Sequence, residues 1–310
     1  MMVDPRIHEI THAQRWCDSF IAESYASDRT VEAIKSYRPA AVIHLAGRDR
    51  SDMSLLDGMA YWETDVSSSI RLARACAGSG VKAFMLASTC DIYLPSENCL
   101  DERANVAPRS AHTSARAATE MLIADLARAS GLTSVAMRFS SVGGAISNPA
   151  SVGPLRGRSG LINRMIESHA HGSPFNIHGR DWPTGDGTPE IDLLHVHDAA
   201  SALVLSLEWA LSNRGSHAFN TSTGRHTTVQ QLVDTAEAIL GAHLPYRYMG
   251  KRPQDAGWAR FSPNALTAAT GWVPKMTTED VIRDSIQWYG GPTYASYAGL
   301  RIGHRFDPYR

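Results

Sequence analysis

The chain has 310 residues, yet its first glycine is Gly47. Glycine-rich turns let a backbone approach phosphate groups closely, because they carry no side chain in the way. The first 46 residues therefore contain no such turn. This absence argues against the usual way in which an α/β protein anchors a dinucleotide.

The chain also lacks an excess of charge of either sign, because its 30 Lys and Arg residues nearly balance its 31 Asp and Glu residues. A net charge of −1 leaves no basic footprint for nucleic acid. No apolar run approaches the roughly 20 residues that cross a bilayer, and the first residues lack the apolar core of a secretory signal. The four cysteines show no metal-type pairing, which is typical of reduced thiols. We therefore expect a cytoplasmic protein that binds no metal, nucleic acid or membrane.

Short apolar runs alternate with helical patterns in the first half of the chain. The runs cover 41–47, 82–88 and 134–140, and the helical patterns between them cover 61–78 and 112–130. Strand and helix alternating at this spacing indicate consecutive right-handed βαβ units. The sequence thus predicts an α/β fold with a parallel sheet.

The pattern changes after about residue 145, where Gly, Pro, Ser and Asn crowd 143–160. Helices and short strands then alternate as far as residue 289, and no internal repeat is present. We expect three parts, namely a Rossmann-like domain over 1–145, a smaller lobe over 146–290 interleaved with the last sheet elements, and an irregular tail over 291–310.

Several strings between about residues 20 and 290 resemble, in register, the extended short-chain dehydrogenase/reductase superfamily and its UDP-galactose 4-epimerase branch. They are His44-Leu-Ala-Gly47, Ala87-Ser-Thr89, Trp182-Pro-Thr-Gly-Asp-Gly-Thr188, Asp192-Leu-Leu-His-Val-His-Asp198, Arg252-Pro-Gln-Asp255 and Gly271-Trp-Val-Pro274. The resemblance implies a Rossmann-like doubly wound parallel sheet with a smaller C-terminal substrate-binding α/β lobe. It also implies that the first βα unit of that fold is lacking, because the chain begins near the family's second strand.

The resemblance places a hydrogen-bond donor and an altered catalytic pair in one pocket. Thr89 matches the family serine that bonds the substrate hydroxyl, and the tyrosine and lysine of the family are His112 and Arg116 here. An i, i+4 spacing still puts both on one helical face. Histidine can act as acid or base near neutrality, whereas arginine stays protonated. Tyr93 is the nearest phenol and an alternative acid, and we expect Cys90 beside it to be inert.

The remaining site residues also follow from the resemblance. Ser141, Arg252 and Asp255 are the expected substrate-side contacts, Arg252 holding a nucleotide diphosphate. If NAD binds, Asp4 would meet the adenosine ribose, and Gly47 and Asp65 would lie on the cofactor side. With no glycine-rich turn, however, the expectation is that no cofactor binds, unless that absence reflects only where the sequence starts.

Three functions follow from these features. The leading hypothesis is a cofactor-independent isomerase, lyase or cyclase that uses the sugar pocket of the family it resembles, with His112 as acid/base. The alternatives are a non-catalytic pseudoenzyme that binds a ligand or partner, and a conventional NAD-dependent UDP-hexose 4-epimerase whose N-terminus is missing. The expected ligand is a small molecule such as a nucleotide sugar. The resemblance implies a homodimer through helices 61–78 and 112–130, with a heteromer as the alternative.

Overall fold

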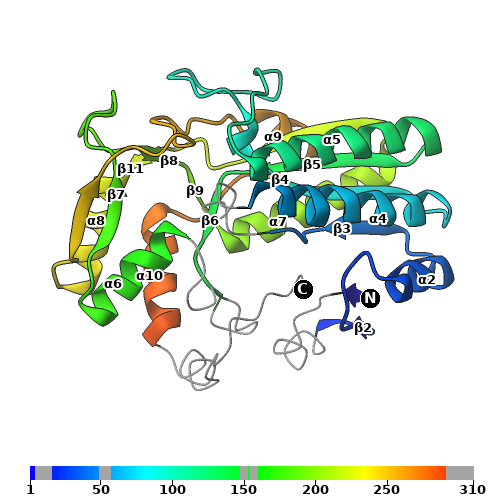
Figure 1. Cartoon of the computed structure of the whole chain (residues 1–310), viewed down its shortest axis with the longest axis horizontal. Coiled ribbons are helices and arrows are strands. Elements are labelled where there is room, and N and C mark those ends of the chain that lie inside the picture. Colours follow the sequence, from blue (N-terminus) through cyan, green and yellow to red (C-terminus); the bar gives the residue numbers. More distant parts are fainter. Residues whose placement is uncertain (4–15, 49–56, 147–152, 154–159, 291–310) are drawn as a thin grey trace.

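Four parallel strands form the central sheet of the computed structural model, which describes residues 1–3, 16–48, 57–146, 153 and 160–290. Their order across the sheet is β10–β5–β4–β3 (Figure 1). The strands are β3 (Ala41–His44), β4 (Ala83–Thr89), β5 (Thr133–Phe139) and β10 (Ser216–Thr221). The predicted α/β fold with a parallel sheet is confirmed.

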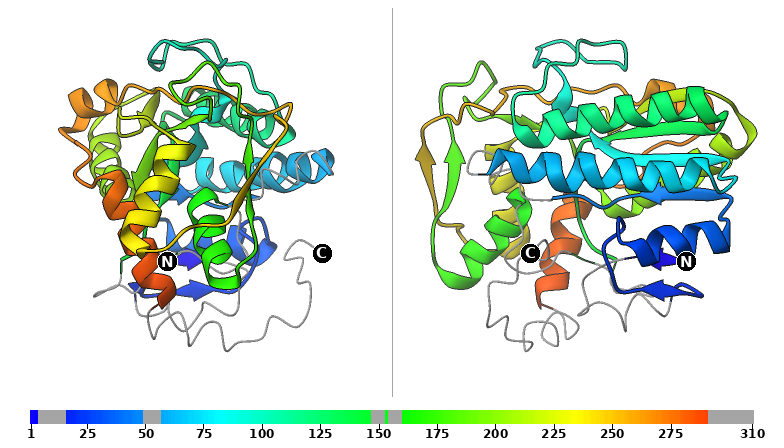
Figure 2. Two further views of the ribbon diagram at one scale, coloured as in Figure 1. Left: turned by 90° about the vertical axis from the view of Figure 1, so that its left-hand side faces the viewer. Right: turned by 45° about the vertical axis from the view of Figure 1, so that its right-hand side comes forward.

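Helices cover both faces of this sheet because side chains alternate along each strand. On β4, Phe84 and Leu86 pack against one set of helices, whereas Ala83 and Met85 pack against α7 on the opposite face. The first face carries α4 and α5, which lie side by side in both figures (Figure 1, Figure 2). These helices are α2 (Asp28–Tyr37), α4 (Ser68–Ala77), α5 (Ala111–Ser130) and α7 (Val196–Ser212), with α9 (Asn264–Thr270) beyond α7.

The predicted helix 61–78 is continuous but not uniform. It comprises α3 (Gly58–Tyr61), a π-helical turn η4 (Trp62–Ser67) and α4. A π turn inserts an extra residue into the helix and is frequent at functional sites. Its consequence here is the inward position of Asp65, which is buried.

A separate two-stranded parallel sheet lies near the N-terminus. It pairs β1 (Met2–Val3) with β2 (Phe20–Ile21), neither of which the sequence analysis identified. Among the described residues, β3 pairs only with β4, and the two sheets share no strand pair. The lack of a first βα unit stays a prediction.

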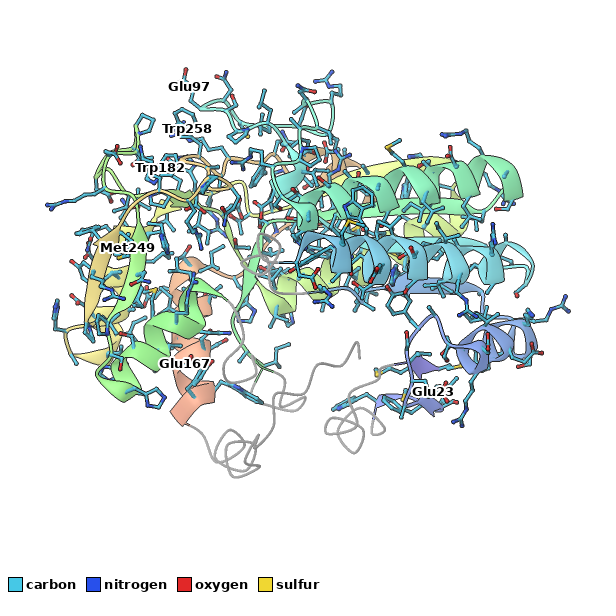
Figure 3. All side chains as sticks on the ribbon, viewed as in Figure 1. Glu23, Glu97, Glu167, Trp182, Met249 and Trp258 are labelled. Carbon is cyan, nitrogen blue, oxygen red and sulfur yellow. The ribbon has the colours of Figure 1, made fainter. Side chains whose placement is uncertain are left out.

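The C-terminal lobe has its own apolar core, built from the inward faces of three helices and the strands between them. The helices are α6 (Leu161–His171), α8 (Val229–Leu240) and α10 (Thr278–Gly290). The short strands are β6 (Ser141–Gly143), β7 (Phe175–His178), β8 (Glu190–Ile191), β9 (Leu193–His195), β11 (Thr227–Thr228) and β12 (Tyr246–Met249). Figure 3 shows the side chains of Trp182, Met249 and Trp258 on this lobe.

The division at residues 145 and 290 remains a prediction, although α7 and β10 return from the second half of the chain to the main sheet, as an interleaved lobe requires. The tail 291–310 and Asp4 lie outside the described residues. No helix within the described ranges combines the length and apolar character that a membrane crossing needs.

Candidate functional site

The site forms where the carboxyl ends of β3 and β4 meet the start of α5. Parallel strands end at the same edge of their sheet, so Gly47, three residues after β3, and Thr89, the last residue of β4, follow neighbouring strands there. Ser110 begins α5 with a capping box, in which its hydroxyl accepts the Thr113 amide and the Thr113 hydroxyl accepts the Ser110 amide. This cap fixes the first turns of the helix, which carry His112 and Arg116.

His112 is held as a neutral imidazole. Burial, and then the positive charge of Arg116, lower its pKa from 6.5 to about 4. The ring meets that of Tyr61 edge to face, with 5.8 Å between the centroids. Its Nδ1 atom is buried and has no hydrogen-bond partner among the described residues. A neutral ring nitrogen without a partner is suited to accept a proton from a ligand hydroxyl.

Arg116 is fixed against the strand end by a carboxylate and a carbonyl. Its Nη2 lies 3.7 Å from Oδ2 of Asp65, with both side chains almost completely buried, and its Nη1 donates to the Ala46 carbonyl at 3.3 Å. The guanidinium lies over Gly47, where a Cβ atom would be only 2.0 Å from Nη2. Glycine is therefore needed here, because a side chain would collide with Arg116. A second reason is its φ of +152°, which lies in the region that other residues avoid.

Asp65 therefore has a partner that the sequence analysis did not foresee. Its Oδ1 accepts the Arg48 amide at 3.0 Å and the Thr64 hydroxyl at 3.1 Å. Burial raises its pKa, and the charge of Arg116 opposes that rise. Its place among cofactor contacts stays a prediction, because the structure shows it as the counter-charge of Arg116.

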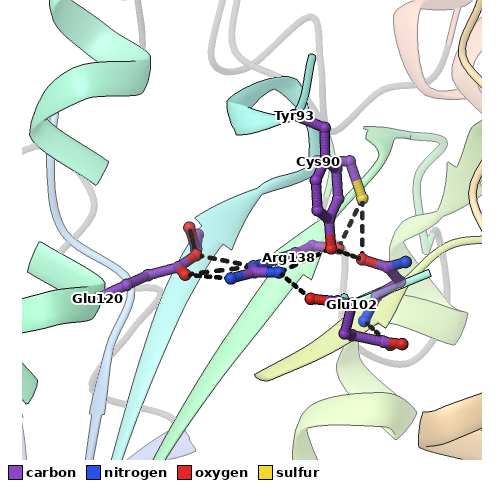
Figure 4. A network of polar contacts seen from close by, with 7 residues as sticks. Cys90, Tyr93, Glu102, Glu120 and Arg138 are labelled. Carbon is purple, nitrogen blue, oxygen red and sulfur yellow. Dashed lines mark hydrogen bonds and ion pairs between the residues drawn. The ribbon is translucent and has the colours of Figure 1, made fainter. Parts of the chain in front are cut away.

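Thr89 is the last residue of β4, whereas Tyr93 is part of a buried polar network (Figure 4). The Thr89 hydroxyl accepts a hydrogen bond from the Asp91 amide at 3.1 Å, and this bond caps the short helical turn that follows β4. The Tyr93 hydroxyl donates to Asn220 and accepts from Arg138, both at 2.7 Å. Burial raises the Tyr93 pKa above its usual range. A phenol held in this way does not favour the alternative role as acid.

The same network explains why Arg138 and Cys90 are not free for chemistry. Arg138 donates to Glu120 through Nε and Nη2, the shortest contact being 2.7 Å. The Cys90 thiol donates to the Arg138 carbonyl, and burial raises its pKa well above the usual value. Arg138 thus stabilises the strand ends, and the thiol stays protonated, as expected of an inert cysteine.

The expected substrate-side residues lie on two further segments. Arg252 and Asp255 form an ion pair within one loop, with Nε donating to both carboxylate oxygens and Nη2 lying 2.8 Å from Oδ1. Ser141 begins β6, is exposed, and donates its amide to the Asp192 carbonyl. Their contact with a substrate remains a prediction.

Two residues beside the site were missed in the sequence. Tyr61 has no local pattern that marks it, because its position depends on the packing of η4 against α5. Arg109 could have been noticed, since it stands three residues before His112 in the segment that leads into α5. Its Nη1 donates to the Asp255 carbonyl at 2.7 Å. No group of three His, Cys, Asp or Glu suited to a metal ion occurs within the described ranges.

The residues present fit one end of a dinucleotide. The small residue Gly47, the buried Nδ1 of His112 and the fixed cation of Arg116 suit a polar group such as a nicotinamide ribose. A glycine-rich phosphate turn is absent from residues 1–46. The fit therefore concerns the reacting end of the cofactor, where the chemistry takes place.

Comparison with known proteins identifies relatives over most of the chain. The sequence model of the NAD dependent epimerase/dehydratase family matches residues 9–221. UDP-glucose 4-epimerase from Rhizobium leguminosarum bv. trifolii is 29% identical over 84% of this chain and 80% of the relative. The enzyme from Azospirillum brasilense is 29% identical over 82% and 74%.

Solved structures agree with this assignment. UDP-glucose 4-epimerase from Brucella ovis in complex with NAD is 27% identical, with a TM-score of 0.83 over 88% of this chain and 85% of that one. The enzyme from Stenotrophomonas maltophila, solved with NAD and formylated UDP-arabinopyranose, has a TM-score of 0.87 over 96% and 91%. At 24% identity, it shows the shared fold.

These findings correct two expectations from the sequence. The leading hypothesis of a cofactor-independent enzyme is wrong, because the matching family is NAD dependent and the similar proteins are UDP-glucose 4-epimerases. The expectation of no cofactor fails for the same reason, and nothing in the comparisons supports a pseudoenzyme. A dinucleotide is held along its whole length, so the absence of one anchor does not exclude its binding. The chain belongs to the NAD dependent epimerase/dehydratase family.

Proposed function

We propose that the protein is an NAD-dependent epimerase acting on a UDP-hexose. The observation that carries this proposal is that α5 bears both His112, whose buried Nδ1 has no hydrogen-bond partner among the described residues, and Arg116, whose guanidinium lies over Gly47. The relatives that support it are named UDP-glucose 4-epimerases, and similar structures hold NAD with UDP or a UDP-sugar derivative.

In this proposal, His112 is the acid/base. Because its pKa is lowered to about 4, the imidazole is neutral at physiological pH and accepts the proton of a sugar hydroxyl. Thr89 bonds the same hydroxyl and orients it. NAD, when bound, supplies a reversible acceptor for the hydride that leaves the sugar carbon. His112 then returns the proton, which its low pKa makes easy.

Arg116 has an electrostatic role in this site. It cannot supply a proton near neutrality, but its charge favours the neutral form of His112 and lies beside the backbone of Gly47. Gly47 and Asp65 line the cofactor side of the proposed site, Asp65 by fixing Arg116. The substrate side is assigned to Ser141, Arg252 and Asp255, with Arg252 directed to the nucleotide diphosphate.

We also propose a homodimer through the helices on the outer face of the sheet. Exposed apolar side chains gather on adjacent elements there, with Trp62 39% exposed on η4, Ile70 36% on α4 and Met121 70% on α5. Large exposed apolar side chains grouped on neighbouring helices are typical of an association surface. A heteromer is the alternative occupant of the same face.

The test combines cofactor and turnover. Purified protein is denatured and the released nucleotide is identified by mass, and NAD is titrated into the remaining apoprotein while the melting temperature is followed. We expect released NAD or a rise in melting temperature, because a ligand that binds only the folded state stabilises it. UDP-galactose should be converted to UDP-glucose, and His112→Asn should abolish conversion while keeping NAD. No NAD binding and no conversion would overturn the proposal.

A further inference from the structure

Two segments from opposite parts of the chain meet beside the site. One is the segment that leads into α5, and the other is the loop that contains Arg252 and Asp255. They are joined by Arg109, whose Nη1 donates to the Asp255 carbonyl at 2.7 Å. Its own amide donates to the Thr113 hydroxyl at 3.1 Å, so its backbone is fixed by the cap of α5. Arg109 thus stands at a defined position, three residues from His112.

The charge of Arg252 in this region is already neutralised. Asp255 accepts two hydrogen bonds from Nε of Arg252, at 2.9 and 3.0 Å, and lies 2.8 Å from Nη2. Side-on pairing of this kind occupies the donors that a phosphate would use. Asp255 thus offsets part of the charge that Arg252 would direct to the diphosphate, so a second cation beside it would strengthen binding.

Arg109 is different in both charge and geometry. Its guanidinium donates to a neutral carbonyl, that of Asp255, and its charge acts on the Asp91 carboxylate nearby. Its Nε is buried without a hydrogen-bond partner, and the Asp255 carbonyl uses only Nη1. The edge formed by Nε and Nη2 is the pair of parallel donors that binds a phosphate or carboxylate bidentately.

We propose that Arg109 binds the diphosphate of the nucleotide sugar through its Nε and Nη2 edge. The proposal rests on the proposed function, because it takes the ligand to be a nucleoside diphosphate derivative. The contact to the Asp255 carbonyl orients the guanidinium in advance, so that little freedom is lost when the ligand arrives. Arg109 is therefore a specificity residue, selecting ligands that carry phosphate next to the nucleoside.

The test measures UDP and uridine binding by calorimetry, since these ligands differ only in the diphosphate. Arg109→Gln keeps a donor for the Asp255 carbonyl but removes the charge. We expect UDP to bind about 10- to 100-fold more weakly, as loss of a hydrogen bond between charged groups predicts, with uridine affinity unchanged. Arg109→Lys should be intermediate, because an ammonium cannot form the bidentate pair. The salt dependence of UDP affinity should also weaken in Arg109→Gln.

The matched control is Arg103→Gln. Arg103 precedes α5 in the same segment, its side chain is 90% exposed, and its partner is the local carboxylate of Asp101. We expect this variant to bind both ligands as the wild type does. If Arg109→Gln weakens UDP and uridine equally, Arg109 only holds the loop and the inference is wrong. If it weakens neither, the inference is also wrong, whereas a wild type that binds no UDP overturns the proposed function itself.

Discussion

The substitution Arg116→Gln offers a quantitative test of how the site controls its proposed base, His112. In the wild type, burial and then the Arg116 charge lower the pKa of His112 from 6.5 to about 4. Because His112 must be neutral to accept a proton, kcat/KM should be flat near neutrality and fall as the pH drops through about 4. The glutamine variant removes only the smaller of the two causes.

The size of the change follows from that order of causes. Burial has the larger effect, so the variant should regain less than half of the interval between about 4 and 6.5, and its acid limb should stay nearer to 4 than to 6.5. At pH 5, the wild type should then keep about 90% of its plateau kcat/KM, and the variant should keep less than that but more than about 36%. An imidazole with an ordinary pKa would keep about 3%.

The assay is the interconversion of UDP-galactose and UDP-glucose between pH 4 and 8, with circular dichroism confirming that the fold persists at each pH. Asp65→Asn combined with Arg116→Gln is the control, because it also removes the carboxylate that Arg116 leaves behind. A wild-type limb near 6.5 would refute the argument from burial. An unchanged limb in Arg116→Gln would refute the role of the charge.

Three further predictions concern stability and assembly. Arg116→Gln alone should lower the free energy of unfolding by about 3–5 kcal/mol, because it leaves the buried Asp65 carboxylate without its counter-charge, and the double variant with Asp65→Asn should lose clearly less; urea unfolding of the wild type, Arg116→Gln, Asp65→Asn and the double variant checks this, and additive losses would contradict it. Tyr93→Phe should lower the free energy of unfolding by about 1–3 kcal/mol, since Arg138 and Asn220 each lose a buried partner. Its kcat should stay near that of the wild type. A large fall in kcat without loss of stability would instead make Tyr93 the acid. Met121→Lys should shift the protein toward a monomer in analytical ultracentrifugation, because it places a charge on the exposed apolar face of α5. Substitution of the exposed Arg128 on the same helix, Arg128→Lys, is the control. An unchanged mass of Met121→Lys would exclude this face as the interface.

The sheet and its main helices could be predicted from the sequence because their signals are local. Strands β3, β4 and β5 are short apolar runs, and α5 has a Ser cap before it and Gly131 in a left-handed conformation after it. The two-residue strands β1 and β2 could not be found in this way. A pair so short has no periodicity of its own, and its formation depends on contacts with distant parts of the chain.

The site could be predicted only in part, for a related reason. The i, i+4 spacing of His112 and Arg116 put both on one helical face, and the helix is observed there. The partner of Arg116 was not predictable, because Asp65 reaches it through a π turn that no periodicity signals. The same applies to Tyr93, which adjoins the strand end in sequence yet turns into the network with Arg138 and Asn220.

The glycine deficit before Gly47 shows why an absence is a weak guide to function. A glycine-rich turn reports on the binding of phosphates, whereas the reaction depends on groups at the other end of the cofactor. In the site proposed for that end, the chain has a glycine where a side chain would collide with Arg116, and a ring nitrogen of His112 without a partner among the described residues. They therefore bear more directly on the chemistry than the missing turn does.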